Sequence, residues 1–380
     1  MDRRTFIVSS SIAALVAASD RVSAQGSPQE AELNAAFETI FQRFLDISPA
    51  LVSSLGLDKG ARAEAKSQLD DDSAAGTQRQ LQLIRKGLAE LAVFKPGMLP
   101  SAAALNLEVV SYFLEQQTVA PARFGLASVG RPYRIFQQGG AYFEIPDFLN
   151  TAHTIGTTTD CEAYLARLEA FATVLDSDSD VQKEDASRGY LAPDFSLELT
   201  LGQMAKLRNQ QANSSSIVQS LVTRASAKGI VGDWEKRAAD IVETKVYPAL
   251  DRQIELVKKL RPTTAAGDGL WRVPQGDAIY GAALKQWTTT DYAPDEVHRM
   301  GLAQVADITA QLDTILKAQG MTNGSVGSRL AALNVNPDQL YAGTPEGKAA
   351  RGATPLAAPA GGAATLPVDC ALAQELPWKK

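Results

Sequence analysis

The 380-residue sequence contains only two histidines, and this shortage bears first on metal chemistry. A helical zinc site needs a second histidine four residues after the first, with a glutamate between them. Four residues after His153 comes Thr157, and four residues after His298 comes Leu302. The sequence therefore lacks a zinc-binding motif. We interpret both histidines as surface or packing residues and predict no metal ligand and no catalytic residue in this chain.

The chain also has only two cysteines, Cys161 and Cys370. An oxidising compartment would permit a disulfide between them, but a chain of this length does not depend on one for stability. Their separation in the sequence does not show that they are close in space. We therefore favour two unpaired, structurally incidental cysteines.

Several other signatures of catalysis or binding are missing. The sequence contains no phosphate-binding loop, dinucleotide-binding turn or G-x-S-x-G elbow, and residues 125–130 exceed the elbow by one residue. Residues 176–180 resemble the start of a calcium loop, but Val181 stands where glycine is needed and Ser187 where a bidentate glutamate belongs. We interpret this stretch as a polar helix end or loop. A net charge of −6 argues against a nucleic-acid partner.

The N-terminus has the pattern of a twin-arginine signal peptide. Arg3 and Arg4 precede an apolar stretch over residues 7–18 and a small-residue site at 22–24. The apolar stretch is 12 residues long, whereas a membrane span needs about 20. We therefore assign residues 1–24 to the signal, in preference to a short buried helix. We expect a soluble protein, periplasmic or secreted, with no membrane partner after cleavage.

Apolar residues recur at helical spacing through most of the remaining chain. No alternation of strands and helices and no fixed-period repeat is present. The sequence thus predicts a mainly α fold, a multi-helix array. The apolar stripes lie within residues 33–47, 81–91, 164–175, 234–257 and 297–315.

Prolines, acids and glycines mark the predicted helix boundaries. Pro49 and Pro96 should end the first two helices, and Asp160 is placed to cap the third. Pro248 should kink or divide the fourth segment. Pro294 opens the last helix, and Gly320 should terminate it. Residues 70–73 are predicted to form a solvated loop.

Residues 125–146 mix glycine with aromatic and alternating apolar residues, typical of a short strand pair or an ordered loop. Within them, Gln138, Gly139 and Gly140 combine an amide with a backbone that a ligand can approach closely. We predict these three residues as substrate-binding. The alternative is a glycine turn whose aromatic neighbours fill the core.

An ordered series of short motifs runs along the chain. The motifs are Phe41-Gln42-Arg43-Phe44-Leu45-Asp46, Ser54-Leu55-Gly56-Leu57-Asp58, Gln138-Gly139-Gly140, Tyr164-Leu165-Ala166-Arg167-Leu168, Gly189-Tyr190-Leu191-Ala192-Pro193, Val246-Tyr247-Pro248-Ala249-Leu250, Tyr280-Gly281-Ala282-Ala283-Leu284 and Pro294-Asp295-Glu296-Val297-His298. In this order they resemble the large group of secreted bacterial proteins known as domain-of-unknown-function family 885. The resemblance covers about residues 30–349, and no single motif carries it alone.

The resemblance implies a predominantly helical protein similar to gluzincin peptidases. Zinc is implied for full-length members, held by an H-E-x-x-[GA]-H-H-like helix and a downstream glutamate in the second half of a longer chain. None of those residues exists here, so no cofactor is expected in this chain. We expect a helical domain over residues 25–349. Residues 350–380, rich in alanine, glycine and proline, should form a disordered tail that reflects a frameshift or a premature end.

The leading hypothesis is an exported, truncated member of this metallopeptidase-like family, whose activity is implied to be peptide-bond hydrolysis. Hydrolysis by this chain alone is not expected, so whether it is an enzyme stays open. Peptides are the expected partners, and the oligomeric state is left open. The alternative is a non-enzymatic periplasmic module that binds peptides or acts as a scaffold. A third alternative is an inert product that is degraded.

Overall fold

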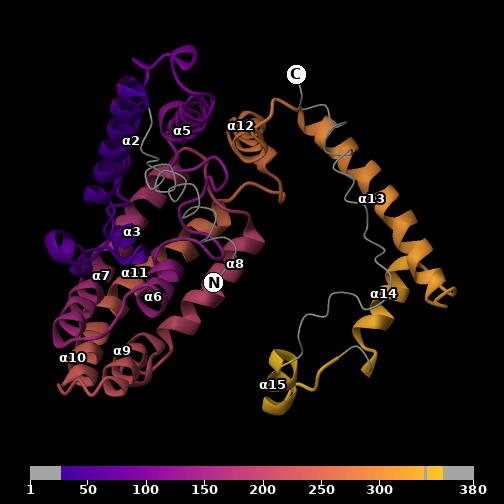
Figure 1. Cartoon of the computed structure of the whole chain (residues 1–380). Coiled ribbons are helices and arrows are strands. Elements are labelled where there is room, and N and C mark those ends of the chain that lie inside the picture. The colour runs from indigo at the N-terminus through magenta and orange to yellow at the C-terminus, as the bar shows by residue number, and fades with distance from the viewer. Residues whose placement is uncertain (1–26, 338–339, 354–380) are drawn as a thin grey trace. The chain divides into compact units, whose positions relative to one another are not determined.

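The computed structural model describes residues 27–337 and 340–353, which are helical apart from their connections (Figure 1). No strand occurs among these residues, and an isolated antiparallel bridge joins Phe136 and Gly139. The predicted mainly α array is confirmed. The predicted signal peptide, residues 1–24, lies outside the described residues, as do Cys370 and the predicted tail beyond Ala353.

The chain divides into two compact units, with the boundary between Asp291 and Tyr292. The first unit contains helices α2 (Pro28–Ile47), α3 (Pro49–Ser54), α4 (Ala74–Leu91), α5 (Ser101–Val119), α6 (Ala141–Thr151), α7 (Thr158–Ser187), α8 (Asp194–Arg208), α9 (Ser216–Ala227), α10 (Trp234–Ile241), α11 (Tyr247–Leu260) and α12 (Gly276–Thr288). The second contains α13 (Pro294–Ala318), α14 (Val326–Asn334) and α15 (Pro345–Ala353).

The first unit is built around α7, which packs against α6, α10 and α11. Its larger core includes Leu168, Phe171 and Leu175, each fully buried at helical spacing. Cys161 is buried in the same core. A second core joins α2, α4 and α5, the indigo-to-purple helices of Figure 1. The apolar stripes predicted within residues 33–47, 81–91, 164–175 and 234–257 therefore form the core of this unit. The stripe at 297–315 lies in the second unit, where Val305, Ile308 and Ile315 are exposed, so it does not form a core among the described residues.

Local signals explain where the helices begin and end. The hydroxyl of Ser27 accepts from the Glu30 amide at 3.2 Å and caps α2. Pro49 ends that helix as predicted, because a proline disfavours helical backbone at the residue before it. The Asp160 prediction was wrong in detail. Thr157 is the N-cap of α7, and Asp160 completes a capping box three residues later.

Pro248 interrupts its segment as predicted. A π-helical turn, η5 (Val242–Val246), separates α10 from α11, and Pro248 is the second residue of α11. A proline has no amide hydrogen to donate to the preceding turn, and a π-turn accommodates the unpaired carbonyls.

Two stretches that were predicted as loops contain structure that the sequence did not indicate: one is helical, and the other has a half-buried aspartate. Residues 176–180 lie inside α7, so their interpretation as a helix end or loop was wrong. The stretch 70–73 is a loop with Asp71 and Asp72 exposed, as predicted, but Asp70 is half-buried and accepts from the Ala50 amide at 2.8 Å. Asp70 thereby caps α3, whose own N-cap residue Ser48 makes no side-chain bond. Burial raises the pKa of Asp70 to about 6.

In the second unit, α13 is the longest helix. Pro294 occupies its first turn and Gly320, with φ of 80°, follows its end, as predicted. Arg329 of α14 is buried and donates to the Asp313 carboxylate of α13 and to the Met321 carbonyl. Leu316 is the buried apolar residue of α13. Across the described residues, none of the helices combines the length and apolarity required to cross a bilayer.

Candidate functional site

The three predicted substrate-binding residues lie in one tight turn that ends at the start of α6. The Phe136 amide donates to the Gly139 carbonyl at 3.4 Å, and the Gly139 amide donates back to the Phe136 carbonyl at 3.0 Å. Gln138 has φ of 63° and Gly140 has φ of 99°. A positive φ is readily adopted by glycine but is uncommon for a residue with a Cβ atom, so Gln138 is the residue whose backbone is strained. The ordered-loop alternative for this region is therefore the observed one.

Asp178 of α7 holds the turn from the core side. This carboxylate, 1% exposed, accepts from the Ala141 amide at 2.6 Å and from Nε of Arg134 at 2.5 Å. One helical turn further, Oε1 of Gln182 accepts from the Ile135 amide at 2.9 Å. Two side chains of one rigid helix therefore fix the backbone on both sides of the turn.

Helix α8 holds the turn from the other side. The hydroxyl of Ser196 accepts from the Gln137 amide at 3.2 Å, and Oε1 of Gln203 accepts from the Gln138 amide at 3.3 Å. The Tyr142 hydroxyl donates to the Phe136 carbonyl and lies 2.8 Å from the same Gln203 oxygen. The main chain of the turn is thus hydrogen-bonded within the protein.

Only one of the three predicted residues is presented at the surface. Gln138 is exposed, whereas Gly139 and Gly140 are buried. A Cβ atom added to Gly139 would lie 2.1 Å from the Phe136 ring, and the Gly140 carbonyl accepts from the Phe143 amide at 3.0 Å. The glycines shape the turn, and Gln138 is the one of the three residues whose side chain is exposed.

Exposed apolar side chains occur on the two helices beside the turn. Phe143, next to the buried Tyr142 on α6, is 39% exposed. Phe195 and Leu199 are one turn apart on α8 and are 49% and 47% exposed. Helices α6 and α8 are in contact. Both helices that flank the turn therefore expose apolar side chains that a peptide side chain could cover.

The charges beneath the turn form a compact cluster around Arg134. Burial raises the pKa of Asp178, although the Arg134 guanidinium opposes this. Burial alone would lower the pKa of Arg134, but Asp178 and Asp72 outweigh it and raise that pKa. Partial desolvation, together with Asp72, raises the pKa of Glu144. Asp178 and the largely buried Arg134 form the inner part of this cluster, which supports the turn, whereas Asp72 and Glu144 are exposed at its edge.

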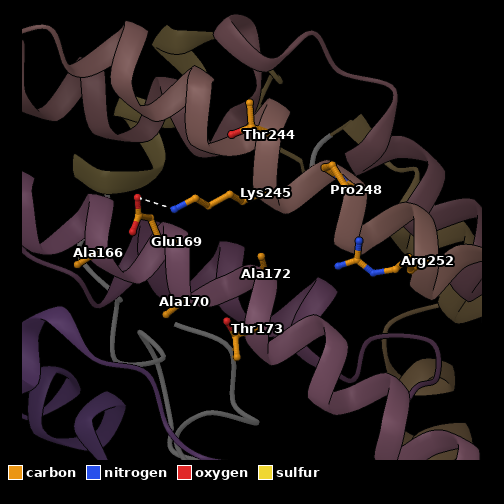
Figure 2. Close-up of a pocket in the computed structure, with 9 residues that line it drawn as sticks. All are labelled: Ala166, Glu169, Ala170, Ala172, Thr173, Thr244, Lys245, Pro248 and Arg252. Atoms are coloured by element: carbon orange, nitrogen blue, oxygen red, sulfur yellow. Dashed lines mark ion pairs between the residues drawn. The ribbon is translucent and has the colours of Figure 1, made fainter.

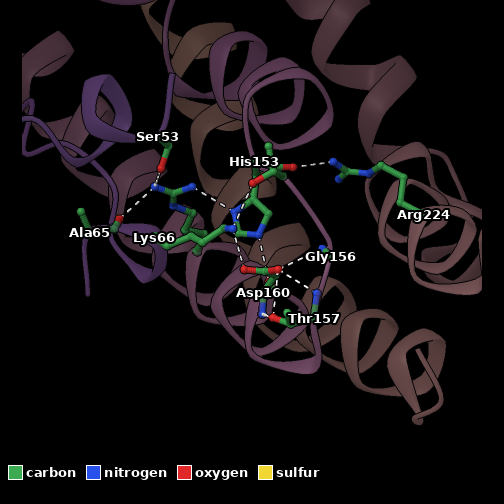
Figure 3. Close-up of polar contacts among 10 residues, drawn as sticks. Ser53, Ala65, Lys66, His153, Gly156, Thr157, Asp160 and Arg224 are labelled. Carbon is green, nitrogen blue, oxygen red and sulfur yellow. Dashed lines mark hydrogen bonds and ion pairs between the residues drawn. The ribbon is translucent and has the colours of Figure 1, made fainter. Parts of the chain in front are cut away.

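His153 lies in a buried polar network instead of at a metal site (Figure 3). Its Nδ1 atom lies 2.9 Å from Nη1 of Arg167, and its Nε2 atom lies 2.9 Å from the Asp160 carbonyl. Arg224 donates to the His153 carbonyl at 2.6 Å. Both ring nitrogens are occupied and cationic groups surround the ring, so this residue does not fit a zinc ion. Burial lowers the pKa of His153 to about 4.

His298 also does not fit a zinc site. It is exposed on α13, and Leu302 lies four residues further along the helix. Among the described residues, no cluster of three histidine, cysteine, aspartate or glutamate side chains could hold a metal ion. The zinc implied by the family resemblance therefore has no fitting ligand set in the described part of the chain.

An open groove of about 570 Å³ lies between α7 and the η5–α11 segment (Figure 2). Lys245 reaches across it to Glu169, with 2.9 Å between Nζ and Oε1. Arg252 donates twice to Asp176 of α7, at 3.0 and 2.7 Å. Because each cation is paired with a carboxylate, the groove offers no excess charge to recruit an ion.

Sequence reasoning missed the side chains that position the turn. Asp178, Gln182, Ser196 and Gln203 lie 38 or more residues after the end of the turn at Gly140, and no local pattern joins them to it. Residues 176–180 contain three aspartates, but their local pattern does not indicate that Asp178 is the one that faces the core. Their role in positioning the turn is evident from long-range hydrogen bonds and not from their spacing in the sequence.

Comparison with known proteins places the chain among bacterial proteins. The family described as "Bacterial protein of unknown function (DUF885)" matches residues 49–355. The crystal structure of "the putative lipoprotein from Colwellia psychrerythraea" aligns with a TM-score of 0.79 and 20% sequence identity, over 86% of this chain. The alignment spans 57% of that longer chain. No match was found among curated proteins.

Proposed function

The chain belongs to the bacterial DUF885 family, described as being of unknown function, and we propose that it is the peptide-binding helical part of an exported protein that resembles zinc peptidases. The observation that carries this proposal is the exposed Gln138, held at φ of 63° by a turn bonded to two helices. Strained backbone persists where its surroundings over-determine it, and such positions concentrate at binding sites.

The chemistry of Gln138 suits a peptide. Its side-chain amide can donate and accept in the same way as a peptide group. Phe143 on α6 and Phe195 and Leu199 on α8 expose apolar surface on the helices that flank the turn, so a bound segment could bury side chains there while its backbone meets the amide. The site that binds would thus be Gln138 itself, with Gly139 and Gly140 acting through the shape of the turn.

Hydrolysis is not proposed for this chain. Zinc catalysis requires ligands that leave a position open for water, and His153 and His298 do not fit such a set. The structural relative continues beyond the region aligned with this chain. Any activity of a longer homologue would need residues outside the matched region. The twin-arginine pattern, and the lipoprotein description of the relative, support export.

The test is peptide capture. Purified protein is immobilised, exposed to a tryptic digest of casein, and the retained peptides are identified by mass spectrometry. One retained peptide is then measured by calorimetry against Gln138→Ala and Gln138→Asn. We expect at least about a fivefold weaker affinity for Gln138→Ala, the loss of one hydrogen bond, and a smaller change for Gln138→Asn, which keeps the amide.

Gln275 provides a matched control, because it is also exposed and has φ of 55°. Gln275→Ala should leave the affinity unchanged. Equal affinities for wild type and Gln138→Ala would refute the proposed site. Cleavage of the captured peptide in the presence of zinc chloride, abolished by substituting His153 or His298, would refute the non-catalytic assignment. Binding without cleavage also fits the scaffold alternative, in which no catalytic partner exists.

A further inference from the structure

A second groove, independent of the Gln138 turn, lies in the N-terminal helices of the first unit. It has a volume of about 710 Å³ and runs between the end of α4 and one face of α5. It is lined by Leu88, Leu91, Ala92, Phe94, Pro96, Ser101, Ala104, Leu105, Leu107, Glu108, Ser111 and Glu115.

The two walls of this groove differ in chemistry. The wall from α4 and the connection after it is apolar, with Leu88, Phe94 and Pro96. The α5 wall carries small and acidic residues at positions 101, 104, 108, 111 and 115, a spacing that places them on one helix face. Leu105, at the edge of that face, is 58% exposed. The groove therefore has one side for apolar contacts and one side with negative charge.

The carboxylates on the α5 wall have a defined spacing. Glu108 and Glu115 are both exposed and lie seven residues apart, which is two helical turns or about 10.5 Å along the axis. Lys285 of α12, which feels the charge of Glu115, is already paired with Asp291 at 2.6 Å. No lysine, arginine or histidine lines the groove. Two cations about 10.5 Å apart would complement this wall.

This spacing distinguishes a helical ligand from an extended one. A helix lying along α5 presents side chains seven residues apart on one face at about the same distance. In an extended strand, a separation of about 10 Å corresponds to three residues, whose side chains point to opposite faces. An extended peptide could therefore not meet both glutamates from one side while also filling the apolar wall.

We propose that this groove binds a basic amphipathic helix of a partner protein. The apolar stripe of that helix would pack against Leu88, Phe94 and Leu105, and two lysines or arginines seven residues apart would meet Glu108 and Glu115. This is a helix-in-groove mode, in which apolar contacts supply affinity and charges select the partner and its register. The site would work whether or not the Gln138 turn binds peptides.

The experiment uses three fluorescein-labelled helical peptides of about 18 residues that share one leucine stripe. The first has two lysines seven residues apart beside the stripe, and the second has glutamates there. The third has its lysines five residues apart, on different sides of the helix. Fluorescence anisotropy with the purified protein measures each affinity. We expect the first peptide to bind about tenfold or more tightly than the others, and this preference to decrease with added salt.

Two variants test the walls separately. Glu108→Lys combined with Glu115→Lys should reverse the preference, so that the glutamate peptide binds about tenfold more tightly than the lysine peptide. Ala104→Phe should fill the groove and weaken the first peptide about tenfold without changing charge. Glu184→Lys, at an exposed position on α7, is the control and should leave the preference intact. Circular dichroism melting shows that each variant is folded.

Failure of the wild type to bind the lysine peptide, or equal binding of all three peptides, would overturn the proposal. So would a preference that survives the double charge reversal in a folded variant, or an Ala104→Phe variant with unchanged affinity. A Gln138→Ala protein that no longer captures peptides but still binds the lysine peptide would show that the two sites are independent.

Discussion

The guanidinium of Arg167 lies 2.9 Å from Nδ1 of His153, and both side chains are completely buried. A guanidinium has no acceptor, so Nδ1 must accept and the ring must be neutral with its proton on Nε2. That proton is donated to the Asp160 carbonyl. Arg167 also donates to the Ser53 hydroxyl at 2.7 Å and to the Ala65 carbonyl at 2.9 Å. The Arg167 guanidinium thus connects α7 to α3, to the 60–67 segment and to the loop before α7.

The first prediction concerns the role of the His153 ring. His153→Phe would leave the Arg167 and Asp160 groups unpaired in the interior, so the free energy of unfolding should fall by about 2–5 kcal/mol. His153→Gln keeps a donor and an acceptor and should lose less than half of that. Urea denaturation followed by circular dichroism measures both. His298→Gln, at an exposed position, should change stability by under about 0.5 kcal/mol, and an equal effect of His153→Phe and His298→Gln would contradict the buried role.

The second prediction is a pair of opposing pH effects. Burial lowers the pKa of His153 from 6.5 to about 4, so its stabilising contribution is complete above pH 6.5 and is lost as the pH falls to 4. Burial raises the pKa of Asp70 from 3.8 to about 6, so the folded state gains stability from this group as the pH falls from 6 to 4. Each effect corresponds to about 2–3 kcal/mol.

Single variants separate these two contributions. Between pH 7 and 4.5, the stability of His153→Gln relative to wild type should increase by about 2 kcal/mol, because its acid-sensitive group has been removed. Over the same range, Asp70→Asn should become less stable relative to wild type by a similar amount. Urea midpoints at several pH values give these differences. Parallel pH profiles for the three proteins would show that neither group titrates as proposed.

The sequence predicted what local spacing determines. The stripe of Leu168, Phe171 and Leu175 in α7, the interruption at Pro248 and the glycine after α13 are all short-range patterns, and each was confirmed. The turn at 138–140 was also recognised as distinctive. Its supports were not, because Asp178 and Gln203 meet it only after α7 and α8 have packed. Of Asp176, Asp178 and Asp180, only Asp178 is buried, because it lies on the face of α7 that meets the core. The run of polar residues contains no apolar stripe from which that face could be predicted.

The third prediction tests whether Asp178 is the support of the turn. Asp178→Ala would leave Arg134, whose side chain is 15% exposed, with Asp72 as its remaining carboxylate partner, and would remove the acceptor of the Ala141 amide. We expect a loss of about 3–5 kcal/mol in the free energy of unfolding. Asp178→Asn retains an acceptor for Ala141 and should lose less.

Hydrogen exchange distinguishes this role from a general packing effect. In a folded Asp178→Asn protein, the amides of 135–141 should exchange about tenfold faster, while those in the middle of α11 keep their protection. Faster exchange spread evenly over the first unit would show that Asp178 supports the core as a whole and not the turn.

The fourth prediction separates stability from binding at Gln138. A side chain in the left-handed region costs about 1 kcal/mol or more relative to glycine. Gln138→Gly should therefore raise the free energy of unfolding by about 0.5–1 kcal/mol, since the Gln203 bond to the backbone amide remains possible. The same substitution removes the side-chain amide and should weaken the affinity for the captured peptide.

Gln275→Gly, at φ of 55°, is the control and should give a similar gain in stability without any loss of affinity. Thermal melting and calorimetry on the same preparations measure both quantities. A Gln138→Gly protein that is more stable and binds equally well would contradict the binding role of Gln138, because a side chain kept in a costly conformation for ligand binding cannot be removed without loss of affinity.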